Sequence, residues 1–174
     1  MSFAMTLRVD ATSARRIARL WVALDAAGID SSRNALGYPA HVTLAVFRDE
    51  APREALCAAL TALAAEWPVL PLTLAGFGVF PAPSYILWLA PVPTAALLAR
   101  HAALLAALPE LSPHPHYVTD AWVPHVTLSG ALRDPSEALQ AILPLWQPMH
   151  CWLDCAELVR FPPVDILCSR QLPV

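Results

Sequence analysis

The chain contains no lysine, so all 11 of its basic residues are arginines, and they are outnumbered by 14 acidic residues. Proteins that bind long nucleic acids present clustered positive charge to the phosphate backbone. A net charge of −3 provides no such general footprint. The composition therefore argues against long double-stranded nucleic acid as a partner and leaves small molecules or the ends of a strand.

A long stretch without charge lies between Glu66 and Arg100, and it would be long enough to span a bilayer. It contains six prolines and two glycines, which interrupt any continuous helix. We therefore expect buried strands and turns there, including a turn at Pro81-Ala82-Pro83, and no membrane span. The N-terminus also lacks the basic and apolar regions of a signal peptide, so a cytoplasmic location is expected.

Cysteine and glycine are too scattered to form a recognisable cofactor motif. The four cysteines contain no CxxC pair, which favours reduced and mostly buried thiols. Five dispersed glycines do not form a glycine-rich phosphate loop. The sequence thus predicts no cofactor.

The apolar residues are abundant, at 57%, and their periodicity predicts a mixture of helices and strands. Strands are expected at 3–9, 41–47, 69–79, 84–90, 123–130, 150–160 and 164–172. Helices are expected after Asp10, after Pro52, at 94–109 and after Asp134, with a polar loop at 29–40. This order predicts an α+β fold, with two antiparallel-rich sheets facing a central cleft and helices outside. We expect one bilobal domain over 1–174, built from pseudo-repeats at about 1–91 and 92–174, and a monomer.

One tetrapeptide occurs twice, as His41-Val42-Thr43-Leu44 and as His125-Val126-Thr127-Leu128. Both copies follow a proline-containing loop and begin an apolar run. Alternate side chains of a strand share a face, so each histidine should lie beside its threonine while valine and leucine enter the core. One strand histidine is commonly a structural residue, but two copies with matching threonines favour a shared site.

Two imidazoles and two hydroxyls across a cleft suit a phosphate diester. Histidine has an ordinary pKa of about 6.5, so one neutral copy and one protonated copy can coexist near neutrality. The neutral copy would act as base and the protonated copy as acid, while the hydroxyls donate hydrogen bonds to non-bridging oxygens. This chemistry needs no metal, and the near-symmetry of the pair leaves the acid and base roles open.

The paired H-x-T-x motifs resemble those of the two-histidine phosphoesterase superfamily, particularly its 2'-5' RNA ligase-like and cyclic phosphodiesterase members. The segment GFGVFPAPSYILWLAP resembles the strand pair that this family places between the motifs. The resemblance implies metal-independent opening of 2',3'-cyclic phosphates of nucleotides or RNA ends, and in some members reversible RNA ligation. It assigns acid and base catalysis to His41 and His125, and phosphate binding to Thr43 and Thr127. No arginine lies between Ala35 and Ala40, which favours a small substrate over RNA ligation.

Two rival interpretations remain at this point. The chain could hold a nucleotide without turnover, or a metal could bind His114 and His116 together with His150, Cys151 and Cys155. Zinc would require three or four converging ligands, and the sequence spacing does not demand that arrangement. Four aromatic residues near the motifs could also stack on a nucleobase, namely Tyr38, Phe80, Tyr117 and Trp122.

Overall fold

The computed structural model describes residues 1–30, 32–81 and 84–174, so Ala82 and Pro83 of the expected turn lie outside the described residues. The strands are β1 (Ser2–Val9), β2 (His41–Arg48), β3 (Leu70–Pro81), β4 (Tyr85–Pro91), β5 (Val126–Leu132), β6 (Met149–Phe161) and β7 (Asp165–Gln171). The helices are α1 (Ala11–Ala26), α2 (Ser32–Leu36), α3 (Arg53–Glu66), α4 (Ala95–Ala106) and α5 (Pro135–Ile142), with short 3₁₀ turns at Pro115–Tyr117 and Leu143–Leu145.

The seven strands form one hydrogen-bonded antiparallel sheet in the order β2-β1-β6-β3-β4-β5, with β7 pairing with β6. The α+β class is confirmed, but the two sheets expected from the sequence are joined. Strand β6 joins them because it is long enough to pair twice. Its first part, Met149 to Leu153, pairs with β3, and Leu153 to Phe161 pairs with β1.

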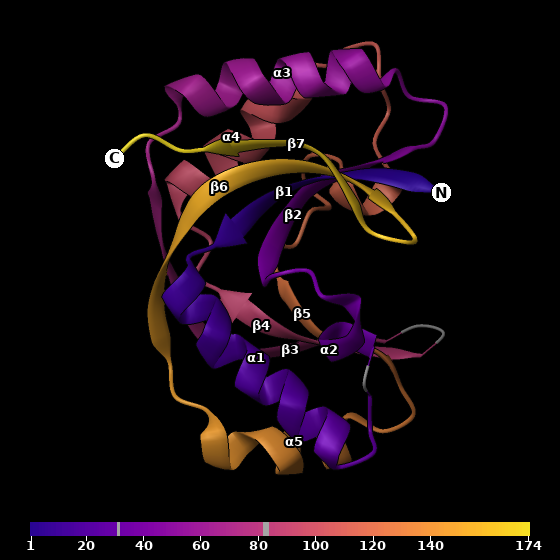
Figure 1. Ribbon diagram of the computed structural model, residues 1–174, viewed down its shortest axis with the longest axis vertical. Coiled ribbons are helices and arrows are strands. Elements are labelled where there is room, and N and C mark those ends of the chain that lie inside the picture. Colours follow the sequence, from indigo (N-terminus) through magenta and orange to yellow (C-terminus); the bar gives the residue numbers. More distant parts are fainter. Residues whose placement is uncertain (31, 82–83) are drawn as a thin grey trace.

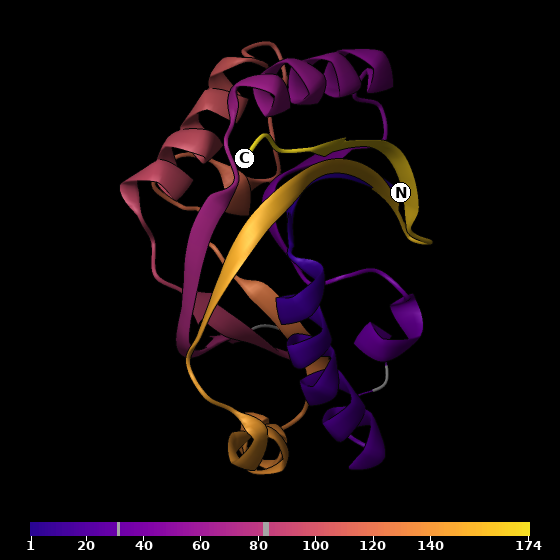
Figure 2. The ribbon, with the colours of Figure 1, turned by 60° about the vertical axis from the view of Figure 1, so that its left-hand side comes forward.

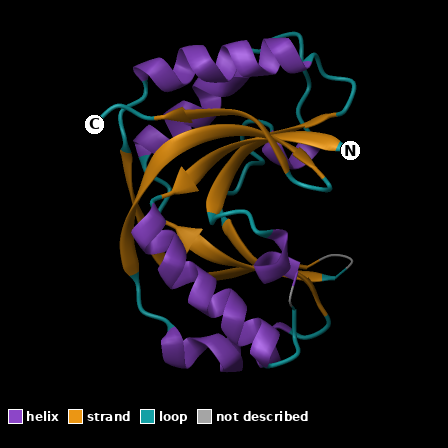
Figure 3. Ribbon diagram, viewed as in Figure 1, coloured by secondary structure: helices purple, strands orange, loops and turns teal. Residues whose placement is uncertain are grey.

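The sheet bends between two lobes, with helices on its outer side (Figures 1 and 3). Helices α3 and α4 cover the lobe that contains β1, β2 and β7, whereas α1 and α5 cover the lobe that contains β3, β4 and β5 (Figures 1 and 2). Each lobe therefore combines segments from both halves of the chain. The order helix, motif strand, helix and two strands occurs twice, and descent from a duplicated unit stays a prediction.

The core follows the predicted periodicity. The apolar face of α1 is buried, and Asp10 caps the helix by accepting hydrogen bonds from the backbone N–H groups of Thr12 and Ser13. The expected loop at 29–40 instead contains α2, and β5 begins at Val126 rather than near residue 123. None of the helices in the described residues is long and apolar enough to cross a membrane.

A close approach between β3 and β4 explains one glycine. Gly78 and Trp88 are cross-strand partners, and a Cβ added at Gly78 would overlap the Trp88 ring. Any side chain there must displace the indole, which also lies beside the motif residue His125. Gly76, on the same strand, has open space around the equivalent position.

We expect Gly78→Ala to destabilise the fold by about 1–3 kcal/mol, because overpacking a filled position forces its neighbours to move. Gly76→Ala is the matched control and should be neutral or slightly stabilising, by roughly 0.5 kcal/mol. Urea unfolding of the two variants measures the difference. Equal stabilities would show that the Gly78 contact does not constrain the strand pair.

Candidate active site

The two motif strands lie at opposite ends of the sheet order, yet β2 and β5 are in contact. The bend of the sheet brings its two edges together between the lobes. In both motifs the valine and leucine are buried, whereas the histidine and threonine are only half-buried. The predicted alternation is therefore present in β2 and in the segment that enters β5, and both polar faces are directed away from the core.

Two tryptophans from neighbouring segments bind the backbone of the motif strands. The indole N–H of Trp122 donates to the backbone carbonyl of Thr43 at 3.0 Å, and the indole N–H of Trp21 donates to the carbonyl of Thr127 at 3.3 Å. The free edge of a strand has backbone groups that need partners. The two bonds supply such partners, so Trp122 fixes Thr43 to the loop before the second motif and Trp21 fixes Thr127 to α1.

Both imidazoles are held in the same way. The Nδ1 atom of His41 lies 2.8 Å from the Pro39 carbonyl, and Nδ1 of His125 lies 2.8 Å from the Val123 carbonyl. A carbonyl only accepts hydrogen bonds, so each Nδ1 carries the proton and donates it. In the neutral state this leaves each Nε2 with a free lone pair, which can accept a proton or bind a ligand.

A buried polar network supports His41. The Tyr38 ring lies against the His41 ring, with centroids 4.7 Å apart, and the Tyr38 hydroxyl donates to Glu157 at 2.7 Å. Glu157 is buried and is also bound by Arg8 at 3.0 Å and Ser169 at 3.0 Å. These donors compensate a carboxylate removed from water. Tyr38 itself is only 5% exposed, so it lies behind His41 and is not open for base stacking.

His125 has an aromatic environment instead. Phe80 meets its ring edge-on at a centroid distance of 5.0 Å, and Trp88 lies at 6.0 Å. Phe80 and Trp88 are themselves stacked, at 5.0 Å. The surroundings of the two imidazoles therefore differ, although their backbone anchors match.

Tyr117 links the loop before the second motif to the first motif. The turn that carries Tyr117 packs against β2, and the Tyr117 backbone carbonyl accepts a 2.9 Å bond from Nε2 of His101. His101 stacks on Trp122 with the ring planes 5° apart. Trp122 is thus a buried support for Thr43, whereas Tyr117 and Phe80 line the adjacent cavity.

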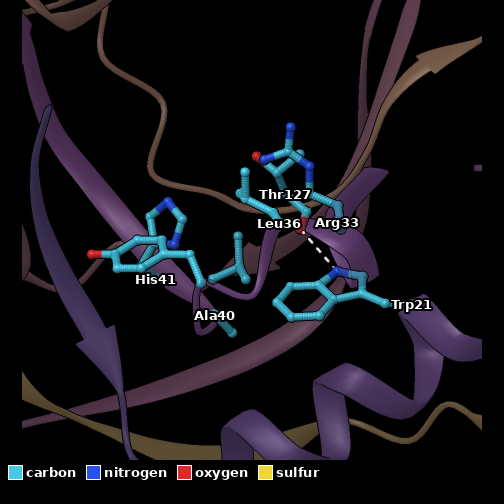
Figure 4. A pocket seen from close by; sticks show the side chains of 8 residues that line it. Trp21, Arg33, Leu36, Ala40, His41 and Thr127 are labelled. Carbon is cyan, nitrogen blue, oxygen red and sulfur yellow. Dashed lines mark hydrogen bonds between the residues drawn. The ribbon is translucent and has the colours of Figure 1, made fainter. Parts of the chain in front are cut away.

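Two pockets border the motif residues. One cavity of about 590 Å³ is lined by His125, Tyr117, Phe80 and the loop histidines His114 and His116. A smaller pocket is lined by His41, Thr127 and Arg33, among others. Figure 4 shows Arg33, Leu36 and Thr127 grouped at one side of the small pocket, with His41 at the other side.

Burial lowers the pKa of both motif histidines, because the charged imidazolium loses hydration. The pKa of His41 falls to about 4, with a further lowering from the charge of Arg33 and an opposing effect from the Pro39 carbonyl. Burial also lowers the pKa of His125. Without a bound anion, both imidazoles are therefore neutral at pH 7, rather than one neutral and one charged as the ordinary pKa suggested.

The residues of the proposed metal set are dispersed. His114 and His116 are adjacent, with ring centroids 5.0 Å apart. In contrast, His150 contacts Thr73 on β3, and Cys151 is buried against the Leu72 carbonyl. Over the described ranges no group of three or more His, Cys, Asp or Glu side chains is placed to hold a metal ion.

Sequence reasoning did not identify Trp21, Glu157 or Arg33 as parts of this site. Trp21 and Glu157 are far from the motifs they support, by 106 residues for Trp21 and Thr127. Their side chains also fit an ordinary helix face and an ordinary strand. Arg33 lies in the stretch expected to be a loop. Its position eight residues before His41, as a lone arginine, was the one available signal.

The family model described as the 2'-5' RNA ligase superfamily matches residues 9–162. The chain therefore belongs to this superfamily of two-histidine phosphoesterases. A search of the curated protein sequences gives no match.

Solved structures share the fold at low sequence identity. Apo LigT of E. coli is 20% identical with a TM-score of 0.61, and the alignment covers 99% of this chain and 98% of LigT. TT0787 of Thermus thermophilus is 16% identical with a TM-score of 0.63, covering 99% and 98%. Usb1 of Kluyveromyces marxianus is 15% identical with a TM-score of 0.52, also covering 99% and 98%. LigT has also been solved with 3'-AMP and with phosphate.

We expect nitrogen NMR of the ligand-free protein to show both motif histidines as neutral Nδ1–H tautomers at pH 7. On acidification, His41 should titrate at about pH 4 and His125 below 6.5. The reason is that both rings donate from Nδ1 to a carbonyl and both are desolvated. An Nε2–H tautomer, or a pKa above 6.5 for either ring, would overturn this description of the free site.

Proposed function

We propose that this protein is a metal-independent phosphodiesterase that opens 2',3'-cyclic phosphates of nucleotides or RNA ends. The single observation that carries the proposal is the matched anchoring of His41 and His125 on contacting strands. Each ring donates from Nδ1 to a carbonyl two residues before it and leaves Nε2 available. Membership of the 2'-5' RNA ligase superfamily supports the same reaction class.

In the proposed reaction, one neutral imidazole removes a proton from water through Nε2. The oxygen of that water attacks phosphorus, and the bond from phosphorus to one ribose oxygen breaks. The second imidazole, in its protonated form, gives a proton to the departing oxygen. Thr43 and Thr127 donate hydrogen bonds to non-bridging oxygens, so protein groups supply acid, base and phosphate binding.

The protonated imidazole is provided by substrate binding. The bound phosphate diester is an anion, and a nearby negative charge favours the charged form of histidine. The pKa that burial lowers in the free protein is thus raised when the substrate enters. Burial therefore keeps both imidazoles neutral in the free protein, and the imidazolium becomes favourable only next to the bound anion.

The cavities favour a small organic group on the phosphate. Among its described lining residues, the 590 Å³ cavity contains aromatic and apolar groups and two loop histidines but no arginine or carboxylate. Phe80 and Tyr117 offer ring surfaces to a base or sugar. LigT, which shares this fold, has been solved with 3'-AMP. The four free thiols suit the reducing cytoplasm that we propose as the location.

We expect the purified protein to hydrolyse 2',3'-cyclic mononucleotides in the presence of excess chelator. His41→Ala and His125→Ala should each lower kcat/KM by about 10²–10⁴, the usual contribution of a positioned acid or base. Thr43→Ala and Thr127→Ala should lower it by roughly 10- to 100-fold, as expected for one hydrogen bond to a charged group. Product formation followed by chromatography provides the rates.

His150 and Thr73 form a matched control pair, since they are hydrogen-bonded at 3.0 Å on β6 and β3 and line neither pocket. Their alanine variants should keep full activity. Binding of the nucleotide without turnover would replace the proposal by a binding function. Activity that chelator removes would replace it by metal-dependent hydrolysis.

The pH dependence follows from the lowered histidine pKa values. The active free enzyme holds one proton on the pair, and this form is most abundant between the two pKa values, both below 6.5. The plot of kcat/KM should therefore be bell-shaped with its maximum below pH 6.5, falling at higher pH as the last proton leaves. The maximum of kcat should lie at higher pH, because bound phosphate raises both pKa values. A kcat/KM that rises steadily to pH 9 is incompatible with this mechanism.

A further inference from the structure

Arg33 lies close to both motif strands. It comes from α2 and lines the small pocket together with His41 and Thr127 (Figure 4). Its Nη2 atom is 3.6 Å from the position that a Cβ on Gly130 would occupy, so the guanidinium lies close to the backbone of β5 just after the second motif. Its charge is near enough to lower the pKa of His41.

Among the described residues, no carboxylate forms an ion pair with the Arg33 guanidinium. Its Nε atom is buried and, in the part of the chain that the structure describes, has no hydrogen-bond partner. The ion pairs found there are Arg8 with Glu157 and Arg160 with Asp165, and neither involves Arg33. A buried donor without an acceptor carries a desolvation penalty, and an anionic ligand that accepts from it removes that penalty.

The helix that carries Arg33 is fixed to the second motif strand. The carboxylate of Asp30 accepts hydrogen bonds from Ser129 and from the backbone N–H of Gly130, and it also accepts from the N–H of Ser32 at the start of α2. These bonds outweigh burial and lower the pKa of Asp30, which therefore stays ionised at neutral pH. Asp30 thus fixes the position of α2 relative to the part of β5 that follows Thr127.

The other groups of the site lack a fixed positive charge. The threonine hydroxyls are neutral, and both imidazoles are neutral in the free protein. Among the described lining residues of the two pockets, Arg33 is the one that carries a permanent charge. A phosphate anion entering the site would therefore find its strongest electrostatic partner at this position.

We propose that Arg33 is a third phosphate-binding residue, whose guanidinium contacts a non-bridging phosphate oxygen on the Thr127 side of the site. This inference rests on the proposed function for its role in turnover, but its binding role is independent of hydrolysis. It also orients the substrate. The charged oxygens face the small pocket, and the sugar and base extend into the 590 Å³ cavity beside His125.

Inorganic phosphate is the probe that tests this assignment, with binding followed through the NMR signals of His41 and His125. Arg33→Met should weaken phosphate binding by at least about tenfold, since charge-assisted hydrogen bonds are the strong ones. Arg33→Lys should lose less, because it keeps the charge but not the planar fork. Arg19→Met is the control, because Arg19 is exposed on α1 and lines a different pocket.

A second readout separates this role from a merely structural one. Removing the charge in Arg33→Met should raise the pKa of His41, whereas Arg33→Lys should leave it nearly unchanged. Thermal melting identifies a variant that fails to fold, and Arg33→Lys then decides the result.

Unchanged phosphate affinity in Arg33→Met would overturn the assignment, as would an equal loss in Arg19→Met or an absence of phosphate binding by the wild type. If the wild type binds phosphate through Arg33 but leaves 2',3'-cyclic nucleotides intact, the proposed function fails and the assignment of Arg33 stands. If hydrolysis depends on both histidines but not on Arg33, the proposed function stands and the assignment of Arg33 fails.

Discussion

Strands β2 and β5 end the hydrogen-bonded order of the sheet, and the whole site depends on how their two free edges are held together. Each edge presents a motif threonine whose carbonyl receives an indole N–H, from Trp122 for Thr43 and from Trp21 for Thr127. An unpartnered carbonyl at these positions would cost free energy, so the two tryptophans stabilise the position of each motif threonine. The bend that brings the edges into contact is provided by β6, which pairs with β3 at its start and with β1 beyond. The two indole hydrogen bonds and the long strand β6 thus both determine where the motif threonines lie.

The backbone anchors of the two imidazoles are alike, but their surroundings are not. The His41 ring packs against Tyr38, whose hydroxyl donates a 2.7 Å hydrogen bond to the buried carboxylate of Glu157. The charge of Arg33 also lowers the pKa of His41. His125 rests on Phe80 beside a larger, mainly apolar cavity. A symmetric pair would bind a diester equally well in two orientations. In the proposed complex, the polar side near His41 and the aromatic side near His125 would give the substrate one preferred orientation, with phosphate oxygens toward Arg33 and the organic group toward Phe80.

The sequence predicted those features that depend on short-range periodicity. Alternation in a strand was enough to place His41 beside Thr43 and to bury Val42, and the cap at Asp10 marked the start of α1 correctly. Features that depend on long-range pairing were beyond such reasoning. Nothing in the local pattern of β6 shows that it joins both lobes into one sheet, and nothing in α1 marks Trp21 as the partner of Thr127. Arg33 was hidden for another reason, since α2 is too short to show helical periodicity and owes its position to Asp30. The lowered pKa values likewise arise from burial, which follows only from the assembled lobes.

In the proposed mechanism both imidazoles act on a single phosphate held between the two strands. A crystal structure with a slowly hydrolysed 2',3'-cyclic phosphorothioate would show this arrangement. We expect phosphorus between the two rings, with Nε2 of His41 and Nε2 of His125 each within about 2.6–3.2 Å of a phosphate oxygen or of the attacking water. A phosphate bound by one histidine alone, or bound at His114 and His116 away from the motif strands, would contradict it.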